Sequence, residues 1–71
     1  MNISDTVTLR ALVHALKGEI AWMRIYPGTW HGKPWDCMGV EAMQDAVRAF
    51  GDCTVRVIKP GFHSVIVVID N

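Results

Sequence analysis

The sequence predicts a small α+β domain with the element order α-β-α-β-β. Two segments have apolar residues at helical spacing and end at a glycine, and three segments have the apolar pattern of strands. A chain of 71 residues forms one domain, so residues 1–71 are expected to share a single core. We therefore expect a three-stranded mixed sheet with two helices on one face.

The first predicted helix covers about residues 5–17. Ser4 or Asp5 can cap its N-terminus, because a short polar side chain accepts a hydrogen bond from a free backbone amide. Gly18 suits the position that ends a helix. The apolar spacing predicts a buried stripe of Leu9, Leu12, Val13 and Leu16.

The second predicted helix begins at Asp36, which is a suitable N-cap, and ends at Gly51. Alanines between the larger apolar residues would let this helix approach a sheet closely. Its expected buried stripe consists of Val40, Met43, Val47 and Phe50.

The first predicted strand covers residues 19–26 and stops at Pro27-Gly28. Side chains alternate between the two faces of a strand, so its apolar residues fall into two sets. One face would carry Ile20, Trp22, Arg24 and Tyr26, and the other would carry Ala21, Met23 and Ile25.

Residues 53–59 and 62–70 are predicted to form a hairpin. Pro60-Gly61 fits the two central positions of a type II turn, which would place Ile58 opposite His63. Residues 65–69 are apolar on both faces, so the last strand is expected at the centre of the sheet. We expect Val55, Val57, Ile66 and Val68 to face the core, and Arg56, His63, Val65 and Val67 to lie on an open sheet face.

The predicted topology is a split β-α-β arrangement with strand order 1-3-2. A right-handed crossover through the second helix would make the first two strands parallel, with the last strand antiparallel between them. A simple 1-2-3 meander is the alternative. Bare Val65 and Val67 on the open face would leave an apolar patch, which favours a homodimer.

The segment from Tyr26 to Cys37 holds two of the three tryptophans, Trp30 and Trp35. Its prolines and glycines predict an irregular loop over residues 27–36 rather than a helix or a central strand. The two rings either cap the core of a small domain or form a contact surface, because Trp is enriched among the residues that dominate protein interfaces.

The charge balance weakens two function classes. Seven basic and seven acidic residues give a net charge of zero. A general nucleic-acid binder usually has a basic excess, and a mimic of the DNA backbone an acidic one. Nucleic-acid binding stays as an alternative, in which the rings of Trp30 and Trp35 would stack on bases and Arg24, Lys33, Arg56 and Lys59 would contact phosphates.

The residues suited to chemistry have no standard spacing. His31, Asp36, Cys37, Cys53 and His63 match no zinc pattern, and neither a metal nor another cofactor is expected. Cys37 at a helix start could be a nucleophile with His31 or His63 as base, but the adjacent carboxylate of Asp36 opposes thiolate formation. We therefore expect that the protein is not an enzyme.

The expected location is the cytoplasm. The chain starts at a methionine without a basic signal-peptide region, so we expect a complete protein with no targeting segment. The longest apolar run, Val65 to Ile69, is five residues and too short to cross a membrane.

The expected function is that of a non-enzymatic protein-binding module. The residues carry no motif of a known family. A small domain without a catalytic set or a charge bias acts by occupying a surface of another protein or protein complex, and such domains are common among phage and mobile-element proteins. An inhibitor of a bacterial defence system, of the anti-CRISPR type, is the narrower expectation. The predicted partner-binding residues are Tyr26, Trp30, His31, Lys33, Trp35, Arg56 and His63.

Overall fold

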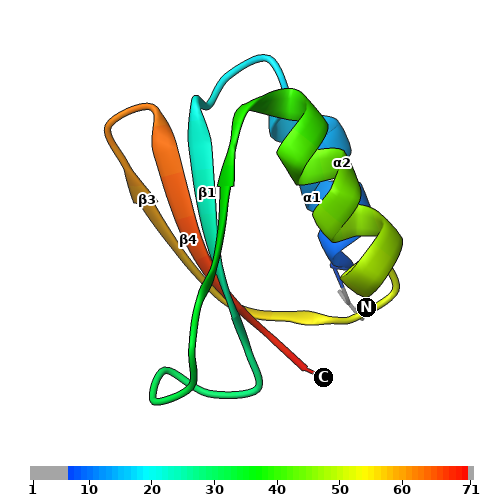
Figure 1. Cartoon of the computed structure of the whole chain (residues 1–71), viewed down its shortest axis with the longest axis vertical. Helices are drawn as coiled ribbons and strands as arrows, with labels where there is room; N and C mark the ends of the chain where they lie inside the picture. Colours follow the sequence, from blue (N-terminus) through cyan, green and yellow to red (C-terminus); the bar gives the residue numbers. More distant parts are fainter. Residues whose placement is uncertain (1–6, 71) are drawn as a thin grey trace, which may run out of the picture.

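The computed structural model describes residues 7–70, in which two α-helices pack on one face of a four-stranded β-sheet (Figure 1). This confirms the predicted small α+β domain with two helices and a sheet, but the order is α-β-β-α-β-β. The elements are α1 (Leu9–Leu16), β1 (Trp22–Pro27), β2 (Trp35–Met38), α2 (Gly39–Phe50), β3 (Val55–Gly61) and β4 (Ser64–Ile69).

The sheet has the strand order β2-β1-β4-β3. β1 and β4 are parallel neighbours at its centre, while β2 pairs antiparallel with β1 and β3 pairs antiparallel with β4. The domain therefore consists of two antiparallel hairpins joined by a parallel central pair. The prediction that the valine-rich last strand lies inside the sheet is confirmed.

The prediction of three strands is wrong, because Trp35–Met38 forms the edge strand β2 inside the segment expected to be a loop. Pro34 precedes the strand, so its missing amide hydrogen does not interrupt the ladder. An edge strand needs a partner on one side only, and four residues are enough to pair with β1. Asp36 consequently lies in β2 and does not cap α2.

The predicted antiparallel hairpin of the last two strands is confirmed, but the predicted direction of the first strand relative to them is wrong. The first and last strands, β1 and β4, are parallel, whereas they were expected to be antiparallel. The missed strand explains the difference: β2 reverses the chain before α2, so the connection through α2 leads from β2 to β3. Because each edge strand is antiparallel to its central neighbour, β2 and β3 run in the same direction.

The β3–β4 hairpin turns two residues later than predicted. Pro60 and Gly61 belong to β3, and the connection consists of Phe62 and His63, with Gly61 paired to Ser64. His63 has a positive φ of 52°, which a tight hairpin connection often requires. Ile58 therefore lies opposite Val67 rather than opposite His63.

The face of β4 that points inward is the opposite of the predicted one. Val65 and Val67 are 2% and 0% exposed and belong to the core, whereas Ile66 is half-buried on the face away from the helices. β4 is apolar on both faces, so its own pattern does not choose between them. A bulge between Val55 and Val57 places Val55 against the core and Val57 on the other face.

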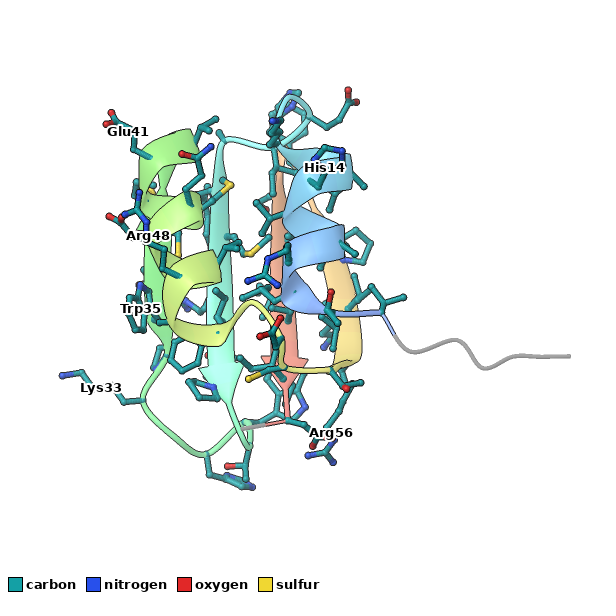
Figure 2. The ribbon with its side chains drawn as sticks, turned by 90° about the vertical axis from the view of Figure 1, so that its right-hand side faces the viewer. His14, Lys33, Trp35, Glu41, Arg48 and Arg56 are labelled. Carbon is teal, nitrogen blue, oxygen red and sulfur yellow. The ribbon has the colours of Figure 1, made fainter. Side chains whose placement is uncertain are left out.

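The helices cover one side of the sheet, as the view from that side shows (Figure 2). Buried core side chains come from both helices and from β1, β2 and β4, while β3 contributes the partly buried Val55. Most of the two predicted helix stripes are confirmed. Val40 is an exception, because it is 41% exposed at the start of α2. The buried core consists of Leu9, Val13, Met23, Ile25, Cys37, Met43, Ala46, Val65, Val67 and Ile69.

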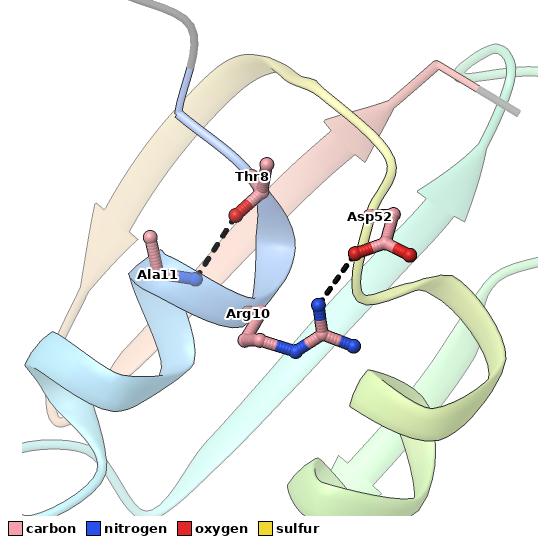
Figure 3. Close-up of polar contacts among 4 residues, drawn as sticks. All are labelled: Thr8, Arg10, Ala11 and Asp52. Atoms are coloured by element: carbon pink, nitrogen blue, oxygen red, sulfur yellow. Dashed lines mark hydrogen bonds and ion pairs between the residues drawn. The ribbon is translucent and has the colours of Figure 1, made fainter.

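The start of α1 is fixed by a side-chain cap and by the segment after α2. The hydroxyl of Thr8 accepts a hydrogen bond from the amide of Ala11, and Arg10 forms an ion pair with Asp52 (Figure 3). The amide of Leu9 also donates to the carbonyl of Cys53. The predicted caps Ser4 and Asp5 lie outside the described residues.

The two faces of the sheet predict different sensitivities to truncation. Ile25→Ala removes a side chain that is 0% exposed in the core and should lower the free energy of unfolding by about 2–5 kcal/mol. Ile66→Ala removes a half-buried side chain and should cost about 1 kcal/mol. Urea denaturation at low protein concentration measures both values. Equal losses, or a larger loss for Ile66→Ala, would contradict this assignment of faces.

Candidate functional site

The second face of the sheet carries both aromatic residues of β1. Alternation places Trp22, Arg24 and Tyr26 on this side, opposite the core residues Met23 and Ile25. Within residues 7–70, no helix or strand lies over this side. We call it the open face; its residues are Trp22, Arg24, Tyr26, Trp30, Asp36, Met38, Val57, Lys59, Gly61, Ser64, Ile66 and Val68.

Arg24 connects a ring and a carboxylate at the centre of the open face. Its guanidinium lies over the Trp22 ring, with 5.7 Å between Cζ and the ring centroid. The same group donates from Nε and Nη2 to the two oxygens of Asp36, at 2.6 and 3.3 Å. This hydrogen-bonded pair raises the pKa of Arg24 above its ordinary value. The guanidinium is thereby held in position over the indole ring.

Trp30 belongs to the open face because the loop after β1 bends back over the sheet. Its ring packs on Tyr26 with 5.0 Å between centroids, and the ammonium of Lys59 lies 5.5 Å from its centroid. Val68, between Tyr26 and Val57 in the sheet, is only 2% exposed beneath these groups. The Trp30 ring itself stays 41% exposed. A large apolar ring is thus held against the sheet and presented to solvent.

Backbone contacts anchor this loop at its first turn. Gly28 has a positive φ of 95°, a conformation that favours glycine, and its amide donates to the carbonyl of Ile69 at 2.8 Å. The carbonyl of Gly28 accepts a hydrogen bond from Nη1 of Arg56 at 3.1 Å. Two further hydrogen bonds, from His31 and Gly32 to Thr29, close the loop. The position of Trp30 is therefore determined by the sheet to which the loop is attached.

Trp35 lies on the opposite side of the sheet from Trp30. It pairs with the core residue Ile25, and its ring makes an edge-to-face contact with Phe50 of α2, with centroids 4.9 Å apart. The two tryptophans expected to act together do not form one surface. Trp35 closes the edge of the core, although 38% of it remains exposed.

The other predicted partner-binding residues are also separated. Lys33 is exposed near the β2 edge and Arg56 lies at the β3 edge, on opposite sides of the molecule (Figure 2). His31 is exposed in the loop, and His63 packs against Phe62 in the hairpin connection. Of the predicted set, Tyr26 and Trp30 are joined by a ring contact, and Arg56 contacts their loop through the carbonyl of Gly28.

Sequence reasoning left open whether Trp22 or Met23 faces away from the helices, and it placed Ile66 in the core. It considered Arg24 and Lys59 only for nucleic acid. The alternation of Trp22, Arg24 and Tyr26 was a usable signal, because three consecutive positions on one strand face carry large side chains. No such pattern indicated that Trp30 lies on the open face, because its position depends on the conformation of the loop after β1.

Cys37 is enclosed in the core, which opposes the nucleophile hypothesis. Its side chain is 0% exposed, and burial raises the pKa of the thiol, with a smaller contribution from the charges of Asp36 and Asp45. A protonated, inaccessible thiol is a poor nucleophile. Among the described residues, no three His, Cys, Asp or Glu side chains gather in a group suited to a metal ion.

The helix side has one shallow groove of about 140 Å³ between α1 and α2. Its lining includes Arg10 and His14 of α1 and the C-cap residue Lys17, which are exposed to solvent, and Arg10 already pairs with Asp52. This arrangement is a solvated basic rim rather than an enclosed binding site. The lining residues are Arg10, Val13, His14, Lys17, Gln44 and Val47.

No protein-family model matches the chain, and comparison with curated proteins and with solved structures gives no significant match. In the described part of the chain, neither helix has the length and hydrophobicity needed to span a membrane. The surface chemistry of this chain is therefore the basis for a proposed function.

The environment of Cys37 predicts slow alkylation. In the folded protein at neutral pH, iodoacetamide should modify Cys37 much more slowly than the half-buried Cys53, and both at similar rates in urea. Because the thiol pKa is raised in the folded state, its contribution to stability is complete below the ordinary thiol pKa of about 8.5. That contribution is lost as the pH rises through the raised folded-state pKa.

Mass spectrometry of the alkylated peptides measures the two rates. Cys37→Ala serves as the control for the pH dependence, because it removes the titrating group from the core. Rapid alkylation of Cys37 in the folded protein would show that its thiol is accessible and ionised.

Proposed function

We propose that this protein is a non-enzymatic protein-binding module whose contact surface is the open face. The observation that supports this most is the grouping of Trp22, Tyr26 and Trp30 with Ile66 on one side of the sheet. Rigid aromatic rings supply large contact area at a low entropic cost, and they dominate the energetics of many protein interfaces. The surface differs from the predicted loop site, but the proposed class of function is the same.

The charges on this surface favour a protein partner over nucleic acid. Asp36 and Arg24 neutralise each other, and Lys59 is the remaining charged group of the open face. A nucleic-acid platform would need several cations directed at phosphates. Lys33 and Arg56, which the nucleic-acid alternative required, lie at opposite edges of the molecule. The partner that fits is a protein surface with an apolar centre and a carboxylate that can reach Lys59.

The narrower proposal is a cytoplasmic inhibitor encoded by a phage or mobile element, of the anti-CRISPR type. An inhibitor of this kind needs only to cover a functional surface of its target, which a rigid apolar face can do. Its support is the small size of the domain together with the open face.

Paired tryptophan variants test the proposal. Immobilised wild-type protein is incubated with bacterial lysate containing CRISPR effector complexes, and each captured protein is purified for calorimetry. Trp30→Ala and Trp22→Ala should each weaken binding by about 2 kcal/mol or more, roughly thirtyfold in Kd. Trp35→Ala is the matched control, because it removes the same side chain from the helix side of the sheet.

The pattern across the variants decides the outcome. Binding that survives Trp22→Ala and Trp30→Ala in folded protein would refute the open face as the contact surface. Capture of nuclease-sensitive material with a steep salt dependence would instead identify nucleic acid as the partner. Circular dichroism of each variant shows whether lost binding reflects lost structure.

A further inference from the structure

The strand registers arrange the open face in rows that run across the sheet from β2 to β3. One row consists of Met38, Trp22, Ser64 and Gly61, which are paired neighbours in that order. The next row consists of Asp36, Arg24, Ile66 and Lys59. Each row has a member on every strand, and its midpoint lies between β1 and β4.

In both rows the two sides of that midpoint differ: in side-chain size in the first row, and in the charge of the end residue in the second. In the first row, two large side chains on β2 and β1 stand beside a serine and a glycine on β4 and β3. In the second row, the carboxylate of Asp36 is on β2 and the ammonium of Lys59 is on β3, at the two ends. In the first row, each half therefore has the size that would fit the other half, and the two end residues of the second row carry opposite charges.

We propose that two copies of this chain associate face to face through the open face, with a twofold axis that runs parallel to the strands between β1 and β4. This rotation places β2 of each copy over β3 of the other, because the two edge strands exchange positions. Asp36 then meets Lys59 of the second copy, twice by symmetry. Trp22 meets Ser64, and Met38 meets Gly61.

Stacked sheets lie about 10 Å apart, a distance that long side chains fill from both sides. The carboxylate of Asp36 holds Arg24 through one contact on each oxygen and has lone pairs left for a second donor. Lys59 forms none of the ion pairs found among residues 7–70, so its charge is available. The apolar groups covered include Met38, Trp30 and Val57, which are 71%, 41% and 37% exposed in the single chain.

The dimer would cover the same rings that the proposed protein partner contacts. The inference rests on the proposed function in this respect alone: dimer formation and partner binding would exclude each other. Association between copies would then regulate how much of the protein is available to its partner.

Charge reversal at the two ends of the second row tests the dimer. The molar mass of wild-type protein and variants is measured by sedimentation over a range up to high micromolar concentration. The wild type should reach the mass of two chains, and Lys59→Glu should raise the dimer Kd at least about tenfold, because it places two acids together. The double variant D36K/K59E should recover part of the association, since it exchanges the two charges across the interface but gives up the Arg24–Asp36 pair within each chain. Lys17→Glu, the same change at the exposed C-cap of α1 on the helix side of the sheet, is the matched control.

Three results would overturn the inference: a wild type that stays monomeric throughout, an unchanged Kd in Lys59→Glu, or no recovery in the folded double variant. The two proposals fail separately. Loss of the dimer with retained, Trp30-dependent partner binding would refute only the dimer. A dimer that behaves as described, with partner binding insensitive to Trp22→Ala and Trp30→Ala, would refute only the proposed function.

Discussion

The parallel pairing of β1 with β4 is the interaction on which the rest of the structure depends. It joins two hairpins that would otherwise be separate, and it supplies the centre of the core through Met23, Ile25, Val65 and Val67. Backbone hydrogen bonds extend the junction at both ends, from Ala21 to His63 and from Gly28 to Ile69. Because the helices cover only one side of this pair, its other side carries the candidate surface.

The parts of the fold that could be predicted from sequence are the segments whose apolar residues recur at a single clear spacing. Each helix has an apolar stripe and a more polar second side, so most of the burial in the two helices could be predicted. The first strand has apolar residues on both faces, and its pattern alone left open which face is buried. β4 has no polar side between Val65 and Ile69, and its orientation depends on what packs against it. Strict alternation along β3 predicted the wrong face for Val57, because the bulge moves Val55 and Val57 to different faces.

The candidate surface was less predictable than the fold because it depends on a missed edge strand and on one loop. Trp30 and Trp35 are near neighbours in sequence, but the chain crosses the edge of the sheet between them. One ring therefore packs on Tyr26 and the other on Phe50, on opposite sides. The composition of the Tyr26–Cys37 segment correctly singled it out as a place to look for large exposed rings. Its residues did not determine on which side of the sheet each tryptophan ring would lie.

The central position of β4 has a consequence for how the chain reaches its native state. The two hairpins can form from local contacts, but the β1–β4 ladder joins segments far apart in the sequence and must form later. Until then, the six residues of β4 expose an apolar, uncharged strand without proline, which is the composition that favours intermolecular sheets. We expect refolding yield to fall as protein concentration rises, because a second unfolded chain competes with β1 for the same strand edge.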